Sequence, residues 1–477
     1  MKKLLLGSVA LIALGSAANA ADMAARYTKA PVVAPVSNWT GFYVSGGFGY
    51  GQMSSDQSST TNGIATSIDS RTGGRGYFGT VGLGYDYQLT PAWVVGVFGD
   101  AQFGDIRGSL LDLNNGITAR LKNDAAYSVG GRLGYLVAPN VLSYVNAGYS
   151  YGQFKGATFD DGVTTIGKSH RDGWFIGGGV ENDLNLLGIK APGWFMKTEY
   201  RLTEYNRQNS VYAPVNGDGI AFKPYVQTVS TSLVYRFNSH VTPGIDPGTP
   251  FYTKAGRASA YNWTGFYLAG GFGYGMLSSD QHTVDILTGA ATGIDTRAGG
   301  RGYFGTVGGG YDWQINPTWV VGIFGDAQFG DIRGSLADAA TSVTGRLKND
   351  TNYAAGARLG YLIAPNALSY VNAGYSHADF KGVALSDGTF TGKSHRDGWF
   401  IGGGVENDLN LLGIRAPGWF MKTEYRVAEY NRKTSDILDP TTGLSTGTGI
   451  AFKPYVQTVQ TSLVYRFNWG SPVVAKY

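Results

Sequence analysis

The sequence contains no cysteine, few charged residues and, after its first twenty positions, no run of eighteen consecutive apolar residues. The last absence excludes membrane-spanning helices, because each needs about 20 predominantly apolar residues to cross a bilayer. Long runs of Ala, Leu, Glu and Lys, which would predict helices, are also missing. The lack of cysteine fits a compartment in which free thiols oxidise. If the chain crosses a membrane, it does so with strands.

Glycine and aromatic residues are abundant instead. The 477 residues include 73 glycines, 31 tyrosines and 23 phenylalanines, spread through the whole chain. Without a collagen-like period, this composition predicts many strands and turns. The formal net charge is +4, and loss of Lys2 and Lys3 with a leader would leave +2. A nearly neutral chain gives no reason to expect a nucleic-acid partner.

The first twenty residues predict a secretory signal peptide. Lys2 and Lys3 precede the apolar run Leu4–Leu14, and Ala18-Asn19-Ala20 has the small residues of a cleavage site. The segment A-P-V-V-A-P then lies within residues 21–38, which predict an extended periplasmic tether.

The rest of the sequence is a tandem duplication with an offset of about 225 residues. Phe98–Leu110 is identical to Phe324–Leu336, and Lys168–Ile189 to Lys393–Ile414. This period is far too long for a solenoid repeat, so each copy is expected to be a domain. The predicted order is a first domain at 39–238, a periplasmic linker at 239–261, a second domain at 262–468 and a tail at 469–477.

The end of each copy shows the folding pattern most clearly. Pro224–Asn238 returns almost unchanged as Pro454–Asn468. Every second residue suits an apolar surrounding, with Gln227 the exception: Tyr225, Gln227, Val229, Thr231, Leu233, Tyr235 and Phe237. A period of two over about thirteen residues predicts a strand, and the aromatic end favours a membrane-spanning one.

The same reading finds eight strands in the first copy, at about 40–52, 76–89, 93–105, 122–137, 141–152, 172–185, 194–206 and 225–237. Short turns alternate with long polar loops, which is the pattern of outer-membrane barrels. The predicted fold is all-β, with two tandem eight-stranded antiparallel transmembrane β-barrels whose ends lie in the periplasm. Aromatic rings are expected at both membrane boundaries. The candidates are Trp39, Trp93, Trp194 and Phe237 on the periplasmic side, and Tyr50, Tyr77 and Trp174 on the outer side.

Charged residues fall on the inward face of these strands. Eight strands enclose room only for side chains, and an unpaired buried charge costs several kcal/mol. We therefore expect a lumen salt-bridge network that plugs each barrel; a gated ion path through the same residues is the alternative. Asp86 and Asp312 share this face with the main candidates, which are Asp100, Glu181, Glu199, Arg132, Lys197, Arg201 and Arg236, and in copy two Asp326, Glu406, Glu424, Arg358, Lys422, Arg426 and Arg466.

A second group of cations lies near the predicted bases of the outer loops. Guanidinium and ammonium groups at this height can pair with the phosphates of lipopolysaccharide. Ordinary solvated loop charge, paired with Asp69, Asp105 or Asp172, is an equal alternative. The candidates are Arg71, Arg75, Arg107 and Lys122, and in copy two Arg297, Arg301, Arg333 and Lys348.

Other motifs give little support for chemistry. The glycine-rich segment Gly46–Gly51 precedes no helix that would hold a phosphate. His170 and His395 recur without a second histidine or cysteine beside them, and His377 replaces Tyr151 in one copy only. No Ser-His-acid set is duplicated. We therefore predict no catalytic, cofactor-binding or metal-binding residues.

Each copy resembles the small OmpA-like β-barrels of alphaproteobacteria, known as outer-membrane immunogenic or porin-family proteins. The resemblance rests on N-W-T-G-F-Y at Asn38 and Asn262, the glycine-aromatic first strand, and L-V-Y-R-F at Leu233 and Leu463. It implies barrels that serve envelope integrity and surface interactions without enzymatic activity. It also implies that Phe237 and Phe467 are the aromatic signals read by the barrel-assembly machinery, although ten residues follow Phe467.

The sequence thus predicts an outer-membrane protein with two separate plugged barrels, outer-membrane lipids and lipopolysaccharide as partners, and loops that meet extracellular partners. The alternative is one sixteen-stranded barrel built from both copies, a general diffusion porin. An enzyme is a third class.

Overall fold

The computed structural model describes residues 38–237 and 262–467, except 68, 139, 185–187, 214–216, 293–294, 339–340, 342 and 410–413. The predicted signal peptide, linker and tail lie outside the described residues, as does the tether apart from Asn38. In the described part, no helix has the length and apolar character needed to cross a membrane. The chain is all-β, as predicted.

Eight long strands form the first half of the described chain. They are β1 Gly41–Thr61, β3 Ser70–Gln88, β4 Trp93–Asp112, β5 Ile117–Ala138, β6 Val141–Lys155, β9 Ser169–Asp183, β10 Trp194–Tyr205 and β12 Asp218–Arg236. Four short strands lie in the long connections: β2 Ile64–Ala65, β7 Ala157–Thr158, β8 Thr165–Ile166 and β11 Gln208–Ala213.

The second half repeats this order. Its long strands are β13 Gly265–Asp285, β14 Thr296–Gln314, β15 Trp319–Asp338, β16 Val343–Ala364, β17 Ala367–Phe380, β20 Ser394–Asp408, β21 Trp419–Tyr430 and β23 Ser445–Arg466. Its short strands are β18 Val383–Ala384, β19 Phe390–Thr391 and β22 Lys433–Leu438.

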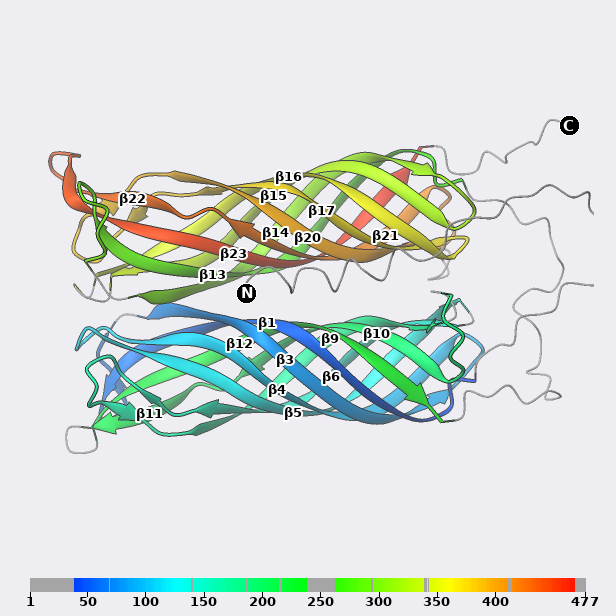
Figure 1. Cartoon of the computed structure of the whole chain (residues 1–477), viewed down its shortest axis with the longest axis horizontal. Coiled ribbons are helices and arrows are strands. Elements are labelled where there is room, and N and C mark those ends of the chain that lie inside the picture. Colours follow the sequence, from blue (N-terminus) through cyan, green and yellow to red (C-terminus); the bar gives the residue numbers. More distant parts are fainter. Residues whose placement is uncertain are drawn as a thin grey trace, which may run out of the picture. The chain divides into compact units, whose positions relative to one another are not determined.

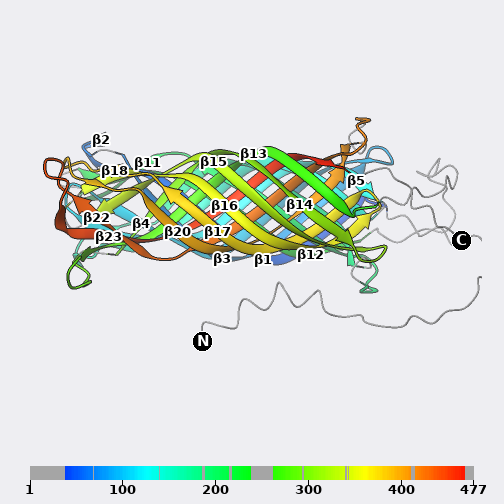
Figure 2. The ribbon, with the colours of Figure 1, turned by 90° about the horizontal axis from the view of Figure 1, so that it is seen from above.

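Neighbouring long strands pair antiparallel in chain order within each half (Figures 1 and 2). The last strand then pairs with the first: β12 lies against β1 from Tyr43–Arg236 to Thr61–Asp218. In the second half, β23 lies against β13 from Tyr267–Arg466 to Asp285–Thr448. Among the described residues, the only strand pairing between the halves is Thr72 with Ala298.

The predicted strand limits agree with the structure at one end only. At the short-turn end, the observed limits lie within two residues of the predicted ones. At the long-loop end the strands continue further: β1 reaches Thr61 rather than 52, and β4 reaches Asp112 rather than 105. These extensions are rich in Ser, Thr and Gly, so they lack the apolar alternation that marks the rest of each strand. Their backbones still pair, because each N–H and C=O needs a partner.

Inside each half, apolar layers enclose the charged residues. In the first half, the layer at the short-turn end contains Trp39, Tyr43, Val94, Leu142, Phe195 and Val234. The layer toward the long loops contains Met53, Phe78, Ile106, Leu110, Leu121, Phe154, Phe159 and Phe222. The second half has equivalent layers around Trp263 and Phe420 and around Ile332 and Phe452. The interior is therefore filled by side chains, and charge is only part of that filling.

The outer surface carries the apolar residues expected of a lipid-facing wall. Phe42, Leu83, Val97 and Val129 are each more than half exposed on alternate positions of their strands. At the short-turn end, the ring of Trp93 packs edge-on against Tyr135, with centroids 5.0 Å apart. The expected place of Trp39 in this outer ring is wrong, because its side chain is fully buried in the interior layer. Trp39 packs inside the first half at its short-turn end.

Candidate functional site

Arg132 and Arg236 join two carboxylates inside the first half. Arg132 donates through Nε to Asp86 Oδ1 at 2.8 Å and through Nη1 to Glu181 Oε2 at 3.1 Å. Arg236 donates through Nε to Glu181 Oε1 at 2.7 Å and through Nη2 to Asp86 Oδ2 at 2.8 Å. Each of the four side chains is at most 3% exposed. Two positive and two negative charges from four strands thus form a neutral, fully enclosed ring, here called the lower cluster.

A second set, here called the upper cluster, centres on Arg201. Its guanidinium donates to both oxygens of Asp100, at 3.1 and 2.8 Å, and to Glu199 Oε1 at 2.7 Å. The hydroxyl of Tyr144 and the amide of Asn146 donate to Glu199 Oε2 at 2.7 and 2.9 Å. These neutral donors satisfy the carboxylate oxygen that Arg201 does not reach.

Lys197 and its equivalent Lys422 are the members of the predicted network that form no ion pair within the described part of the chain. Lys197 is the example in the first half. It lies half-buried on the inward face of β10, two residues before Glu199. Its charge balances the upper cluster, in which Asp100 and Glu199 otherwise face Arg201 alone.

The second half repeats both clusters with nearly the same geometry. Arg358 and Arg466 hold Asp312 and Glu406, and all four side chains are at most 4% exposed. Arg426 donates to Asp326 and to Glu424, each at 2.7 Å. Lys422 is buried close by, and Gln460 adds a hydrogen bond to Glu424 at 3.2 Å.

The guanidinium groups also lie against the aromatic rings of the apolar layers. The guanidinium carbon of Arg236 is 4.3 Å from the ring centroid of Trp39, and that of Arg132 is 4.5 Å from Tyr43. Arg201 lies 4.3 Å from the ring of Phe175. Such contacts stabilise a cation away from water. The arrangement thus holds these charges in fixed positions inside each half.

All eight residues predicted to contact lipopolysaccharide form ion pairs, and for four of them the partner aspartate lies on β1 or β13. Arg71 donates to Asp56 at 2.7 Å, and Arg297 donates to Asp280 at the same distance. Arg75 pairs with Asp280 at 2.5 Å, so this contact joins the two halves. Arg301 pairs with Asp56 at 2.5 Å in the reciprocal contact.

The polar residue Gln227, on the outward face of the last strand, lies beside these reciprocal pairs. Gln227 is fully buried although its position alternates with lipid-facing residues. It pairs in register with Gln52, whose amide donates to the carbonyl of Tyr455 in the second half at 3.2 Å. The guanidinium of Arg75 lies 3.7 Å from the ring of Tyr455, and that of Arg301 lies 3.6 Å from Tyr225. We call this set of contacts the polar seam.

The other four predicted lipopolysaccharide contacts are accessible. The side chains of Arg107 and Arg333 are 59% and 55% exposed, and each donates to the aspartate two residues earlier. Lys122 and Lys348 pair with Asp124 and Asp350 at 2.9 and 2.8 Å. Both the lipid-binding and the solvated-charge interpretations fit these exposed pairs.

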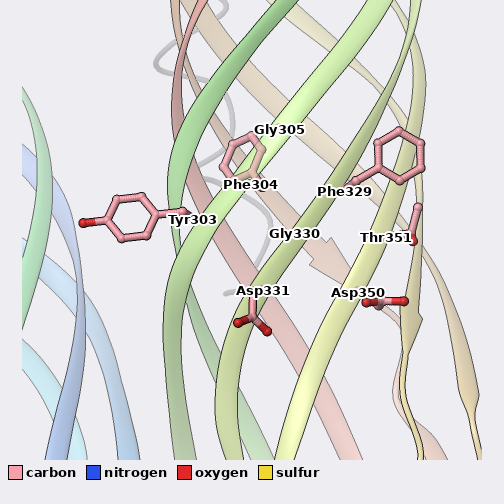
Figure 3. Close-up of a pocket in the computed structure, with 8 residues that line it drawn as sticks. All are labelled: Tyr303, Phe304, Gly305, Phe329, Gly330, Asp331, Asp350 and Thr351. Carbon is pink, nitrogen blue, oxygen red and sulfur yellow. The ribbon is translucent and has the colours of Figure 1, made fainter.

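A depression of about 500 Å³ adjoins the copy-two members of this group (Figure 3). Its polar edge is formed by Asp331 and Asp350, both of which pair with Lys348. Tyr303, Phe304 and Phe329 supply its aromatic wall, and Gly305, Gly330 and Thr351 complete the lining. The pairing of β15 with β16 shifts in register beside this depression, between Phe329 and Ile332.

The structure also brings together residues that the sequence analysis left apart. His377 and Asp379 on β17 lie opposite Asp397 and His395 on β20. His377, Asp379 and His395 have potential metal-ligand atoms within 4.8 Å of one another. Only the strand register shows this grouping, although alternate residues H-x-D and H-x-D on adjacent strands were a usable signal.

Phe237 and Phe467 end the described part of each half. Both are about half exposed, at 51% and 55%. The backbone N–H of Phe237 donates to the carbonyl of Phe42 at 3.1 Å, and that of Phe467 donates to Phe266 at the same distance. Each aromatic ring is thus held at the rim, outside the interior layer.

Comparisons with known proteins agree with this architecture. The family model described as outer membrane protein beta-barrel domain matches residues 7–237 and 253–467. The 31 kDa outer-membrane immunogenic proteins of Brucella melitensis and Brucella suis are each 29% identical over 251 residues, covering 50% of this chain and all of the relative.

Solved structures show only distant likeness. Ail, the attachment invasion locus protein of Yersinia pestis, is 11% identical with a TM-score of 0.21, covering 42% of this chain and 99% of Ail. The Pseudomonas putida toluene transporter TodX is 8% identical with a TM-score of 0.23, covering 90% of this chain and 95% of TodX. These scores carry no argument about function. The family model, in contrast, covers both copies, and with the Brucella relatives it confirms the predicted resemblance: the chain is an outer-membrane protein and belongs to the outer membrane protein beta-barrel domain family.

Proposed function

We propose that the chain forms two separate, closed, eight-stranded barrels that serve envelope integrity and surface interaction without catalysing a reaction. The observation that carries this proposal is the pairing of the last long strand of each half with its own first strand, over nineteen residue pairs in each case. A closed ring leaves no unpaired strand edge in the bilayer, where each unsatisfied backbone group costs several kcal/mol.

The interior of each barrel is sealed, in this proposal, by two charged clusters between apolar layers. Arg132 and Arg236 are each bound to two carboxylates, so an ion moving through the lumen would have to break several buried contacts at once. Removing one partner of a buried pair costs about 3–5 kcal/mol. This supports a structural plug over the gated ion path.

Single-channel recording of the full-length protein in planar bilayers tests the plug. We expect no stable conductance of porin size. The variant Arg201→Ala/Arg426→Ala should show small, flickering currents, because it opens the upper cluster in both halves. Large steady channels from the wild-type protein would contradict the plug and favour the alternative, a sixteen-stranded diffusion porin.

That alternative requires β1 to pair with a strand of the second half. The single pair between Thr72 and Ala298 gives it little support compared with the long pairings that close each half. The assignment as a non-enzymatic protein is supported by the names of the Brucella relatives, which describe outer-membrane immunogenic proteins.

We further propose that exposed cations bind lipopolysaccharide phosphates on the outer leaflet. The observation that favours this is the exposure of Arg107 and Arg333 at the same height as Lys122 and Lys348 on adjacent strands. The variant Arg107→Glu/Arg333→Glu should retain less lipopolysaccharide on purification. Lys190→Glu, an exposed change in the turn between β9 and β10 at the short-turn end, is the control. If both variants retained the same amount of lipopolysaccharide, the proposal would be wrong.

Two partners follow from the proposed barrels. The barrel-assembly machinery would read Phe237 or Phe467, both of which present an exposed ring at the strand end. The long loops would meet extracellular partners.

A further inference from the structure

We propose that the second barrel, and not the first, binds a zinc ion on its outer wall through His377, Asp379 and His395. The three side chains face outward from two adjacent strands, beyond the aromatic residues Tyr375 and Trp399 toward the long loops. Between 30% and 62% of each side chain is exposed, so an ion has direct access from water.

Strand register creates the grouping. Asp379 lies directly opposite His395, and His377 directly opposite Asp397. Directly opposed side chains on one face of an antiparallel pair have Cβ atoms about 4.5–5.5 Å apart. The side chains of His377, Asp379, His395 and Asp397 therefore lie at the four corners of a small square on two paired strands. We call these four residues the histidine square.

The distances are those of a site that needs little movement to close on a metal. His395 Nδ1 is 2.5 Å from Asp379 Oδ1, and His377 Nε2 is 3.4 Å from the same oxygen. Ligand atoms at about 2.0–2.2 Å around a tetrahedral zinc are separated by roughly 3.3–3.5 Å. A modest rotation of the two rings about Asp379 is sufficient.

Asp397 holds His377 in the orientation that binding requires. Its carboxylate Oδ1 lies 2.8 Å from His377 Nδ1. A carboxylate at one ring nitrogen places the proton there and leaves the lone pair on Nε2, toward Asp379. Asp397 is itself fixed by the hydroxyl of Tyr375 at 2.5 Å and by Lys433 Nζ at 3.4 Å. Asp397 is therefore a positioning residue rather than a ligand.

The donor set selects the class of metal. Two imidazoles and one carboxylate suit zinc and related transition ions, whereas calcium and magnesium prefer oxygen ligands throughout. Three protein ligands leave a fourth position open to water.

The first barrel provides a matched control within the same chain. Its equivalent square contains Tyr151, Gln153, His170 and Asp172 in the same register. There the ring of Tyr151 stacks on His170, with centroids 5.5 Å apart. Two of the three ligands are missing, so this barrel should not bind zinc.

Zinc titration against a chromophoric chelator tests the proposal, using untagged full-length protein folded in detergent micelles. We expect one zinc per chain in the wild type and none in His377→Tyr/Asp379→Gln, which converts the square to the first barrel's residues. The reverse change, Tyr151→His/Gln153→Asp, should give two zinc ions per chain. Asp397→Asn should weaken binding by about 10–100-fold.

His282→Asn is the control for a histidine outside the square, and heat-modifiable gel mobility confirms that every variant is folded. Unchanged zinc stoichiometry in His377→Tyr/Asp379→Gln would overturn the proposal. Failure of the wild type to bind zinc, or equal binding of magnesium or calcium, would overturn it as well. If the four side chains only form hydrogen bonds with one another, the wild-type protein will not bind zinc.

Discussion

At the scale of single residues, the buried clusters depend on space left by glycine. A methyl group at Gly96 would lie 2.1 Å from Asp86 Oδ1, and one at Gly322 would lie 2.0 Å from Asp312 Oδ1. The carboxylates that receive both arginines of the lower cluster therefore occupy room that any side chain at these positions would take. The abundance of inward glycine is thus a packing requirement of the charges.

Replacing Gly96 by alanine should displace Asp86 and reduce the free energy of unfolding by about 1–3 kcal/mol, the usual range for overpacking. Gly99→Ala on the same strand is the control, because a methyl there meets only Ser128 O at 3.7 Å. Urea unfolding of the detergent-folded protein measures both. Equal loss in the two variants would show that the strand backbone, rather than the cluster, is affected.

Arg132→Met should be more damaging, because it leaves Asp86 and Glu181 with Arg236 as their remaining partner in the lower cluster. We expect a loss of about 3–5 kcal/mol in the free energy of unfolding. The exposed pair of Arg107 contributes at most about 1 kcal/mol, so Arg107→Met is the control. A loss for Arg132→Met as small as that for Arg107→Met would mean that water reaches the lower cluster.

At the scale of elements, the sequence predicted the strand segments that face lipid, because the bilayer selects apolar residues there. It did not predict the strand extensions toward the long loops, where no such selection acts. Alternation identified Leu233 and Phe237 as outward and Arg132 as inward, since lipid and a filled interior select opposite residues. The extensions beyond residue 52 in β1 and 105 in β4 carry no such contrast, so their pairing could not be read from composition. Trp39 was misplaced because position at a strand end does not tell which face a side chain takes.

The charged residues of the lumen were identifiable from alternation, but their partners were not. β5 and β9 are not neighbours, because β6 lies between them and pairs with both. The contact of Arg132 with Glu181 therefore crosses the interior and cannot be read from the order of the strands. The same limit hid the histidine square. His377 occurs in one copy only, so a search for functional residues shared by both copies does not find it. Its proximity to Asp379 and His395 follows only from the strand register.

The extensions and the membrane-spanning part of a strand should differ in their tolerance of proline. Val129→Pro removes a backbone donor in the lipid-facing part of β5 and should abolish the heat-modifiable band on an unboiled gel. Arg120→Pro lies in the extension of the same strand, where water can satisfy the freed carbonyl, and the band should persist. Loss of the band in both variants would place the extension inside the bilayer.

At the scale of the whole molecule, the polar seam gives each half a surface unsuited to lipid. Gln52, Gln227 and the pairs Arg75–Asp280 and Arg301–Asp56 are buried or half-buried on outward faces. Gly73 allows close approach, because a methyl there would lie 2.3 Å from Ala298 O. The contacts are reciprocal, as expected when duplicated surfaces meet about a pseudo-twofold axis.

A larger residue at Gly73 should therefore separate the halves without unfolding them. The natural absence of cysteine allows spin labels to be placed uniquely at Phe103→Cys and Phe329→Cys, which are exposed positions on β4 and β15. We expect one narrow distance distribution in the labelled parent and a broad one after Gly73→Leu. Gly79→Leu, on an open outward position of the same strand, should leave it narrow. A narrow distribution in both would show that the seam does not hold the halves together.

The histidine square of β17 and β20 has a consequence for how such a molecule can change over time. In an assembly of identical subunits, any new residue is present in every subunit, with whatever harm or benefit it brings. Two copies fused in one chain are not constrained in this way, because each copy has its own codons. One copy can keep Tyr151 and Gln153 while the other acquires His377 and Asp379. Duplication within a single gene thereby lets a symmetric scaffold carry an asymmetric trait.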